Sequence, residues 1–408
     1  MNIELFPPPS PVFASTRKDA LDQLDAFIPA AGRYADHRNH VLPGHTNVSR
    51  LSPAIRHRLI LESECAAAPL QRYAASTIEK IFAGWWIHIE KLPWQLGADF
   101  FYRHLLDGDP ASNILSWRWV AGLQTPGKTY LPRRSNLEKY LPSEVLAMHH
   151  EGLELLDQPQ ALIPPAETRP NITRPSLPTT PPLREGRLGI WIHEEDLLPE
   201  QSPLAALKPS TMLATGDTAS WTRFRYPESK INWLQTALTD AANCAGTAFG
   251  TETRVSFDSS ITETLLRWAA EHQVQQIAAM RPEIGPLHDQ IHRLQTELSN
   301  DGIDLILFDR PEDLVLRPLA TGASLASGRR CRNHSKRKSH KFFLMRLLKR
   351  SSGLQSVLYS NYFGLKSKTT FGESMWARRP RSLRRLTYSW ICDDACASFV
   401  AHVGIKPL

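Results

Sequence analysis

A carboxylate, an amide and an indole recur at helical spacing in the run DGDPASNILSWRWVAG. Asp109 followed by Pro110 is typical of a helix N-cap with proline at the first helical position. Asp109, Asn113 and Trp117 are spaced four residues apart, so they share one face of the predicted helix. Such a face can bind a flat, buried, polar group. It is also typical of a core helix with one satisfied polar pair, and periodicity alone favours that second interpretation.

A second segment with candidate binding groups is NVSRLSP, residues 47–53. Ser49 and Ser52 offer hydroxyls, and Pro53 is expected to open a helix that covers AIRHRLILESECAAA. The free N–H groups and the positive dipole end of a helix N-terminus can hold a pyrophosphate. Ser-x-x-Ser-Pro is also common as ordinary helix capping. Arg50, in the same segment, could pair with a phosphate or with a carboxylate.

Both segments resemble the cryptochrome/photolyase family and occur in the family's order. The run from Asp107 resembles the flavin-site pattern, roughly DGD-x-A-x-N-x-x-x-W-x-W, and NVSRLSP resembles the phosphate-wrapping loop. The resemblance implies a helical FAD-binding domain, with FAD as the cofactor. It also implies light-driven repair of pyrimidine dimers by electron transfer from reduced FAD, as in a deoxyribodipyrimidine photolyase, with damaged DNA as the partner. Nothing in the sequence identifies an antenna pigment.

The resemblance assigns roles to individual residues. Asp107 and Asp109 match the acidic pair beside the ribityl and isoalloxazine portions of the flavin, and Asn113 matches the position that faces its N5. Trp117 matches the proximal electron-transfer tryptophan, and Trp94 matches the next one outward. The expected cofactor-binding residues are Tyr34, Ser49, Arg50, Leu51, Ser52, Asp107, Asp109 and Asn113.

The chain departs from the family between Pro53 and Asp107, which are separated by only about 53 residues. The family has a longer set of helices there, with adenine contacts, part of the substrate-facing wall and the outermost tryptophan. We interpret the difference as an internal deletion between about Phe82 and Trp86. Two alternatives to a repair enzyme therefore stay open. One is a non-repairing, FAD-binding photoreceptor-like protein, and the other is an inactive remnant with a DNA-binding basic tail.

Short apolar runs alternate with helical stretches after residue 187. The runs cover 188–193, 211–214, 254–257, 274–279 and 303–308, and the helical stretches between them include 228–242, 261–272 and 286–299. This alternation predicts a doubly wound parallel sheet. No GxGxxG or Walker loop gives an independent nucleotide signal. The order resembles the α/β domain that photolyases place first, so its place after the flavin segment would be a permuted arrangement.

The predicted organisation has four parts. They are a shortened helical FAD-binding domain at 1–157, a proline-rich linker at 158–186, the α/β domain at 187–326 and a disordered basic tail at 327–408. The tail has 18 Lys or Arg against three acidic residues, a net charge of +15, which leaves −8 for residues 1–326. Such a tail could bind nucleic acid through counterion release, or it could be an unstructured, out-of-frame extension. We favour the extension.

The bulk composition excludes several classes of protein. A hydrophobic content of 42% with 22% charged residues is typical of a soluble globular protein, and no stretch of ~18 apolar residues could span a membrane. The N-terminus lacks the pattern of a signal peptide, and five cysteines without regular pairing suit a reducing cytoplasm. Cys392 and Cys396 have no second Cys or His pair, so we expect no bound metal.

Overall fold

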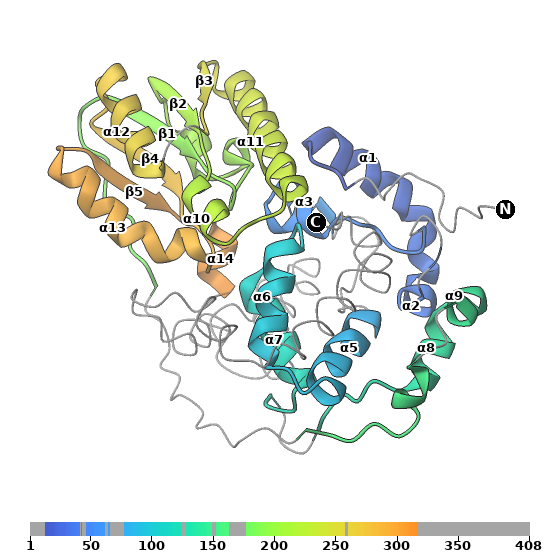
Figure 1. Ribbon diagram of the computed structural model, residues 1–408. Coiled ribbons are helices and arrows are strands. Elements are labelled where there is room, and N and C mark those ends of the chain that lie inside the picture. Colours follow the sequence, from blue (N-terminus) through green and yellow to red (C-terminus); the bar gives the residue numbers. More distant parts are fainter. Residues whose placement is uncertain are drawn as a thin grey trace.

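The computed structural model describes residues 13–40, 42, 46–61, 64–65, 77–124, 128–148, 152–162, 177–257 and 260–316. Within these residues a group of helices packs beside a five-stranded parallel sheet (Figure 1). Residues 163–176 of the linker lie outside the described residues. So does the whole basic tail, including Cys392 and Cys396. None of the described helices combines the length and the hydropathy that a membrane crossing requires.

All five predicted strands are present, with ends shifted by one or two residues in places. They are β1 (Leu188–Ile192), β2 (Thr211–Ala214), β3 (Thr253–Val255), β4 (Gln276–Met280) and β5 (Asp304–Phe308). The order is β3-β2-β1-β4-β5, and every neighbouring pair is parallel. Strand β2 pairs with one edge of β1, and β4, later in the chain, pairs with the opposite edge of β1. The strand order therefore reverses at β1, where an open α/β sheet has its crevice.

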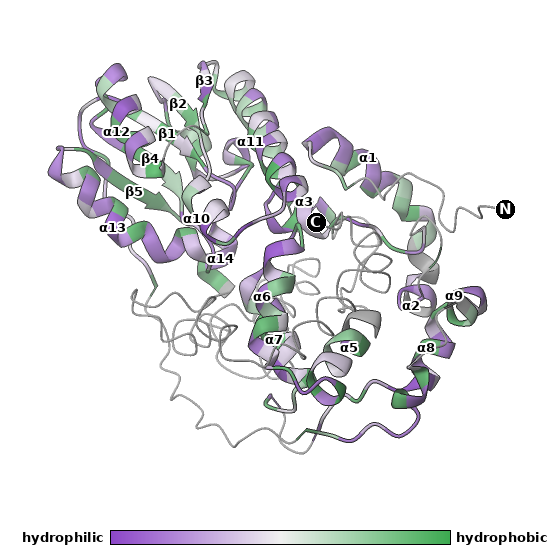
Figure 2. Ribbon diagram, viewed as in Figure 1, coloured by the Kyte–Doolittle hydropathy of each residue, from purple (hydrophilic) through white to green (hydrophobic). Residues whose placement is uncertain are grey.

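Helices cover both faces of the sheet, as predicted for a doubly wound domain. The long helix α11 (Glu228–Phe249) packs on the face that carries Ile190 and Ile192 of β1, while α12 (Ile261–His272) and α13 (Pro286–Asn300) pack on the face of Trp191. Successive residues of a strand point to opposite faces, so a central strand covered on both sides is apolar throughout. Figure 2 shows these hydrophobic strands enclosed by amphipathic helices.

The remaining described elements of this part are short. They are the 3₁₀ turns η5 (Pro199–Gln201) and η6 (Pro203–Ala206) and the helices α10 (Thr218–Arg223) and α14 (Pro311–Leu316). They follow β1, β2 and β5, so they lie near the carboxyl ends of the strands.

The middle of the chain forms a separate helical part with an aromatic core. Its elements are α5 (Thr77–Gly84), the π-helical turn η3 (Trp85–Ile89), α6 (Trp94–His104), α7 (Pro110–Val120), α8 (Arg134–Tyr140), α9 (Ser143–Met148) and the 3₁₀ turn η4 (Leu153–Leu156). Helices α6 and α7 pack against each other, and Trp86, Phe101 and Trp117 are buried between them and η3. Two indoles and a phenyl ring fill this small core because each buries a large apolar area.

Four N-terminal elements occur within the described residues, and the first and the last of them pack on the sheet domain rather than on the aromatic core. They are α1 (Arg17–Phe27), the 3₁₀ turn η1 (Ile28–Arg33), α2 (Tyr34–His37) and α3 (Ser52–Arg56). Leu24 of α1 and Leu51, before α3, belong to the same apolar cluster as Leu238 of α11. The Trp233 indole N–H also donates to the Ala14 carbonyl, at 3.1 Å. Segments distant in the sequence therefore share one core.

The predicted long helix after Pro53 is wrong. Helix α3 ends at Arg56 after five residues, and Arg58 has a φ of +58°, which no right-handed helix accommodates. The local apolar pattern favours helix. However, Arg56 and Arg58 each bind carboxylates of the sheet domain, at Glu195 and Asp196 respectively. Those tertiary contacts override the local preference.

Candidate functional site

The turn between α6 and α7 carries the acidic pair of the predicted flavin site. Asp109 is the N-cap of α7, as predicted, and its Oδ1 accepts hydrogen bonds from the backbone N–H groups of Ala111 at 2.9 Å and Ser112 at 3.1 Å. Gly108 has a φ of +31°, and a Cβ built on it would lie 2.5 Å from Nζ of Lys230. Only glycine fits this position without displacing the lysine.

The structure brings the two predicted segments together at Asp107. The Ser52 hydroxyl lies close enough to the Asp107 carboxyl group to lower its pKa, although 54 residues lie between them in the sequence. Burial raises the pKa of Asp107, and the neighbouring charge of Asp109 raises it further. Lys230 and the Ser52 hydroxyl act in the opposite direction without cancelling the rise.

The predicted phosphate loop is folded back on itself beside α2. Ser49 and Leu51 are buried, and the Ser49 hydroxyl accepts weakly from the Leu51 N–H, at 3.5 Å. The Asn47 amide donates to the carbonyls of His37 and His40, both at 2.7 Å, so the loop is fixed to the end of α2. The loop is thus shaped by its own hydrogen bonds.

Two arginines beside this loop have unused donors. Among the described residues, Nε of Arg38 and Nε of Arg50 are buried and have no hydrogen-bond partner. A buried N–H group without a partner costs free energy, and an anion within reach would remove that cost. The pyrophosphate of FAD has this chemistry. The donors therefore fit the cofactor that the resemblance implies, and Arg38 joins Arg50 as a candidate ligand.

Tyr34 opens α2 and is mostly buried. Its ring meets that of Phe27 edge-on, with the centroids 5.7 Å apart. Burial raises the pKa of its phenol, and the positive charge of Arg38 partly opposes the rise. The phenol is therefore neutral at physiological pH and available as a hydrogen-bond donor.

Asn113 ties α7 to α6. Its side-chain amide nitrogen donates to the Ala98 carbonyl at 2.6 Å. The amide therefore has a structural partner inside the helical part, while its carbonyl oxygen remains an acceptor. Sequence reasoning placed Asn113 on a polar face but did not predict this bond.

Trp117 is buried in the middle of the aromatic core. A Cβ on Gly97 of α6 would come within 2.2 Å of the Trp117 ring, so a glycine at this position lets the indole approach the helix backbone. Phe101 and Trp86 meet the ring edge-on, with centroid distances of 5.3 and 6.4 Å. Trp94 is buried in the same core, and the Arg118 guanidinium lies 5.8 Å from the centre of its ring. Sequence reasoning missed Trp86 as a neighbour of Trp117.

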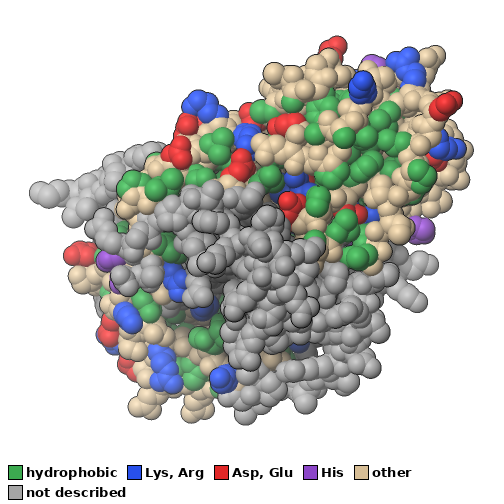
Figure 3. Space-filling model, turned by 180° about the vertical axis from the view of Figure 1, so that it is seen from behind, with side chains coloured by type: hydrophobic (Ala, Val, Ile, Leu, Met, Phe, Trp, Pro, Cys, Tyr) green, Lys and Arg blue, Asp and Glu red, His purple; other side chains and the backbone are tan. Residues whose placement is uncertain are grey.

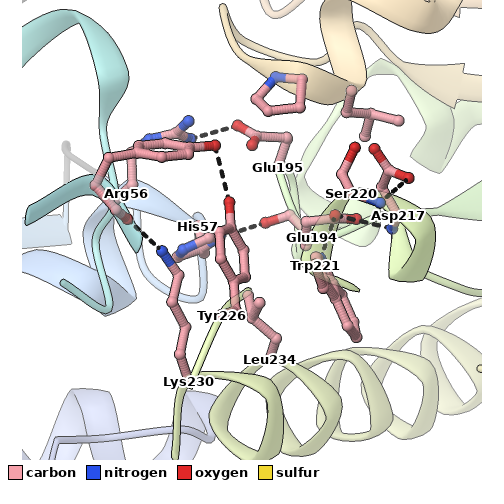
Figure 4. A pocket seen from close by; sticks show the side chains of 14 residues that line it. Arg56, His57, Glu194, Glu195, Asp217, Ser220, Trp221, Tyr226, Lys230 and Leu234 are labelled. Atoms are coloured by element: carbon pink, nitrogen blue, oxygen red, sulfur yellow. Dashed lines mark hydrogen bonds and ion pairs between the residues drawn. The ribbon is translucent and has the colours of Figure 1, made fainter. Parts of the chain in front are cut away.

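A pocket lies where the helical part meets the carboxyl ends of β1 and β2 (Figure 4). It encloses about 400 Å³ between atoms, part of which is open to solvent. Its polar lining comes from both parts of the molecule: Arg56, His57, Tyr102, Glu194, Glu195, Asp217, Ser220, Tyr226 and Lys230. Sequence reasoning missed this set. The signal was the acidic run directly after the central strand β1, at the edge where open α/β sheets bind ligands.

The two neighbouring glutamates of the pocket have opposite electrostatics. An Arg56 guanidinium nitrogen lies 2.5 Å from a carboxylate oxygen of Glu195. Burial disfavours the charge of Glu195, but Arg56 and His57 outweigh burial and lower the pKa of Glu195. Burial and the charge of Asp217 raise the pKa of Glu194 to about 8. Its Oε1 accepts from the Asp217 N–H at 2.9 Å and from the Trp221 indole at 3.1 Å. Its Oε2 is buried with no hydrogen-bond partner among the described residues.

His57 links the sheet edge to the flavin-segment turn. Its Nδ1 lies 2.5 Å from the Glu194 carbonyl oxygen, and its Nε2 lies 3.1 Å from that of Leu106. Burial and the nearby charge of Arg56 lower the pKa of His57 to about 4. The ring is therefore neutral at physiological pH and can donate to only one of the two carbonyls.

Arg58 and Arg310 share a buried carboxylate. Arg58 donates to Asp196 at 2.9 Å, to Glu283 at 3.0 Å and to Asp313 at 2.7 Å. Arg310 binds both oxygens of Asp196, at 2.7 and 2.9 Å. The two guanidinium groups hold the pKa of Asp196 below its usual range even though burial acts the other way. The basic segment 56–58 thus occupies much of the sheet's carboxyl edge.

No cluster of His, Cys, Asp or Glu that could hold a metal occurs within the described ranges. On the face shown in Figure 3, acidic and basic side chains are intermixed over the visible surface of both parts.

Comparison with known families matches one segment of the chain. The α/β sheet with its adjoining helices defines a two-part protein whose helical part carries the candidate site. Residues 76–140 match the FAD binding domain of DNA photolyase. No curated protein and no solved structure matches the chain significantly.

The matched segment runs from α5 to α8 and contains Trp94, Asp107, Asp109, Asn113 and Trp117. This segment is similar to the FAD-binding domain of the photolyase family, and the match supports FAD as the cofactor. Tyr34, the loop at 49–52 and the α/β domain lie outside the match.

Proposed function

We propose that the protein is a light-driven repair flavoprotein that acts on pyrimidine dimers in DNA. The observation that supports this function best is the proximity of the Ser52 hydroxyl to the Asp107 carboxyl group. It joins the candidate phosphate loop to the acidic turn of the family-matched segment, as one continuous cofactor site requires. Damaged DNA as the partner and a cytoplasmic location belong to the same proposal.

Bound reduced FAD would supply the light absorption and the electron that splits a dimer. The chain's own residues have simpler tasks. Arg38 and Arg50 would neutralise the pyrophosphate with their unpartnered donors, and Asp107 and Asp109 would orient the ring and the ribityl chain. Trp117, 2% exposed, would exclude water from one side and serve as the electron donor nearest to the flavin. Extrusion of the dimer from the stack costs least at an already damaged base.

The test begins with the absorption spectrum of the gently purified full chain. We expect flavin bands at a stoichiometry near one, followed by loss of dimers from irradiated DNA under blue light and none in the dark. Flavin without repair would contradict the enzyme and leave a photoreceptor-like protein. The absence of flavin, even after incubation with FAD, would leave only the remnant with a basic tail.

Two variants then test the assigned residues. We expect Trp117→Phe to slow photoreduction of bound flavin at least about 10-fold while leaving FAD affinity within a factor of about three, because phenylalanine fills most of the volume but is much harder to oxidise. The matched control is Trp221→Phe, which changes an indole in the sheet domain. Undiminished photoreduction in the Trp117 variant would refute its role as electron donor.

A further inference from the structure

Lys230 is a buried lysine in the first turn of α11, with 2% of its surface exposed. The N-terminal end of a helix carries the positive end of the dipole, which disfavours a cation. Burial disfavours the charge as well, and it lowers the pKa of Lys230 to about 7, with Asp107 acting in the opposite direction. The positive charge of Lys230 is disfavoured both by the helix dipole and by burial. The groups around its ammonium nitrogen must therefore stabilise that charge.

The first compensation comes from the end of α6. The Lys230 ammonium group donates to the Tyr102 carbonyl oxygen at 2.9 Å. That carbonyl lies in the last turn of α6, where carbonyls lack partners within the helix and carry the negative end of the dipole. The ammonium nitrogen also lies 4.0 Å from the centre of the Tyr226 ring and 5.2 Å from that of Tyr102. Lys230 and Tyr226 extend into the pocket from the α11 side (Figure 4).

The second compensation comes from the acidic turn itself. The ammonium nitrogen lies against Gly108, 2.5 Å from where a Cβ would be, and it is close enough to Asp107 for each charge to shift the pKa of the other. The Lys230 ammonium group therefore contacts the turn that immediately precedes α7. A larger residue at 108 or an uncharged one at 230 would disturb the same contact.

We propose that Lys230, a residue of the α/β domain, is a positioning residue of the flavin site that holds the Asp107–Asp109 turn in place by binding the end of α6 and facing the Asp107 carboxylate. The inference rests on the proposed flavin function and deepens it. The sheet domain, which lies outside the family match, then contributes directly to cofactor binding. Its contribution runs through a single ammonium group rather than through a pocket of its own.

The first experiment measures FAD affinity of the full chain by flavin fluorescence. Lys230→Met keeps the length and apolar stem of the side chain and removes the charge, and we expect it to weaken FAD binding about 10-fold or more. Tyr226→Phe is the matched control. It removes the hydroxyl that donates to the Tyr102 hydroxyl at 2.8 Å but keeps the ring beneath the ammonium group. We expect its affinity to stay within about twofold of the unaltered chain.

A double-mutant cycle separates positioning from general stability. If Lys230 acts through Asp107, the loss caused by Lys230→Met should shrink to about twofold in an Asp107→Asn background. An equal loss in both backgrounds, or an unchanged affinity in the single Lys230 variant, would overturn the proposal. A Tyr226→Phe loss as large as that of Lys230→Met would assign the effect to the hydrogen bond between the Tyr226 and Tyr102 hydroxyls and would overturn the proposal too.

Hydrogen exchange on the cofactor-free chain gives a readout that does not depend on flavin. We expect Lys230→Met to speed exchange of the amides at 105–109 about 10-fold, with α12 unchanged. If the unaltered chain binds no FAD, the proposed function fails, and with it the flavin role of Lys230. The exchange data then still show whether the lysine holds the turn. Unchanged exchange at 105–109 would overturn the positioning role whatever the flavin result.

Discussion

His57 bridges the α6–α7 turn and the carboxyl edge of the sheet, and these two regions use polar side chains in different ways. At the turn and the start of α7, Asp109 accepts two structural hydrogen bonds and Asn113 donates one, and both residues belong to the segment that matches the FAD binding domain of DNA photolyase. At the sheet edge, the charges are paired with one another: Arg56 with Glu195, and Arg58 with Asp196. The usual ligand edge of an α/β sheet is here a docking surface for the chain's own basic segment.

This difference teaches that a cluster of charges at a sheet edge does not by itself indicate a ligand. Buried charges persist where they are paired and hydrogen-bonded, and the pairs at this edge meet that condition within the chain. The predictions below set the docking role of the edge against the binding role of the turn.

The largest effect is expected at Arg58. Arg58→Met would leave Glu283 and Asp313 without their shared partner and Asp196 with Arg310 alone, so we expect a loss of about 3–5 kcal/mol in the free energy of unfolding. Urea denaturation followed by tryptophan fluorescence measures it. The matched control is Arg293→Met, an exposed arginine paired with Glu297, which should cost about 0.5 kcal/mol or less. Similar small losses in both variants would contradict a docking role.

A pH-dependent effect comes next, at Glu194. Its native pKa of about 8 exceeds the ordinary 4.5, so the folded state holds a proton that the unfolded state releases between those values, and stability falls as the pH rises through that window. Glu194→Gln cannot titrate and keeps an oxygen to accept from Trp221. We expect the unaltered chain to lose a few kcal/mol relative to the variant between about pH 5 and pH 9. Parallel stability curves would show that Glu194 is charged when folded.

A smaller effect on the free energy of unfolding is expected at Gly97, which contacts Trp117 in the aromatic core of the helical part. Gly97→Ala would press a methyl group against Trp117, and we expect a loss of about 1–3 kcal/mol. Gly246→Ala in α11 is the control, since its new Cβ would meet atoms no closer than 3.4 Å. Alanine is the better helix former, so the control should be neutral or stabilising by up to about 1 kcal/mol. Thermal unfolding distinguishes the two.

The smallest effect on stability is expected at Asp109. Asparagine caps helices as well as aspartate does, so Asp109→Asn should change the free energy of unfolding by less than about 0.5 kcal/mol, whereas Asp109→Ala should cost about 1 kcal/mol. FAD affinity, measured by fluorescence, should fall several-fold in both variants if the charge orients the flavin. Normal affinity in Asp109→Asn would restrict Asp109 to capping.

Much of the sheet could be predicted because its information is local. Strands β1 and β2 are short apolar runs bounded by turn residues, as fully buried parallel strands must be, and α12 begins and ends where its apolar period does. Helix α3 could not be predicted. The partners of Arg56 and Arg58 lie more than 130 positions away, and no local pattern contains them.

The candidate site divides in the same way. The cap at Asp109 and the burial of Trp117 follow from spacing alone. Lys230 does not, because in the sequence it is an ordinary lysine near the start of a helix, and only the packing of α11 against α6 buries it. Glu194 could be predicted in part. Its position shortly after the central strand predicts a place at the sheet edge, but the sequence does not predict its raised pKa.

The contacts of Arg58 also impose an order on assembly. Its three carboxylate partners lie 138, 225 and 255 positions further along the chain. Contacts of such long sequence separation form late, because the loop between them must close first, and during synthesis the partner residues do not yet exist. The segment that follows the phosphate loop can pair with Glu195 and Asp196 first, and its contacts are complete only when α14 has emerged from the ribosome. Cofactor loading is expected to be a post-translational step that waits for α14 to complete these contacts.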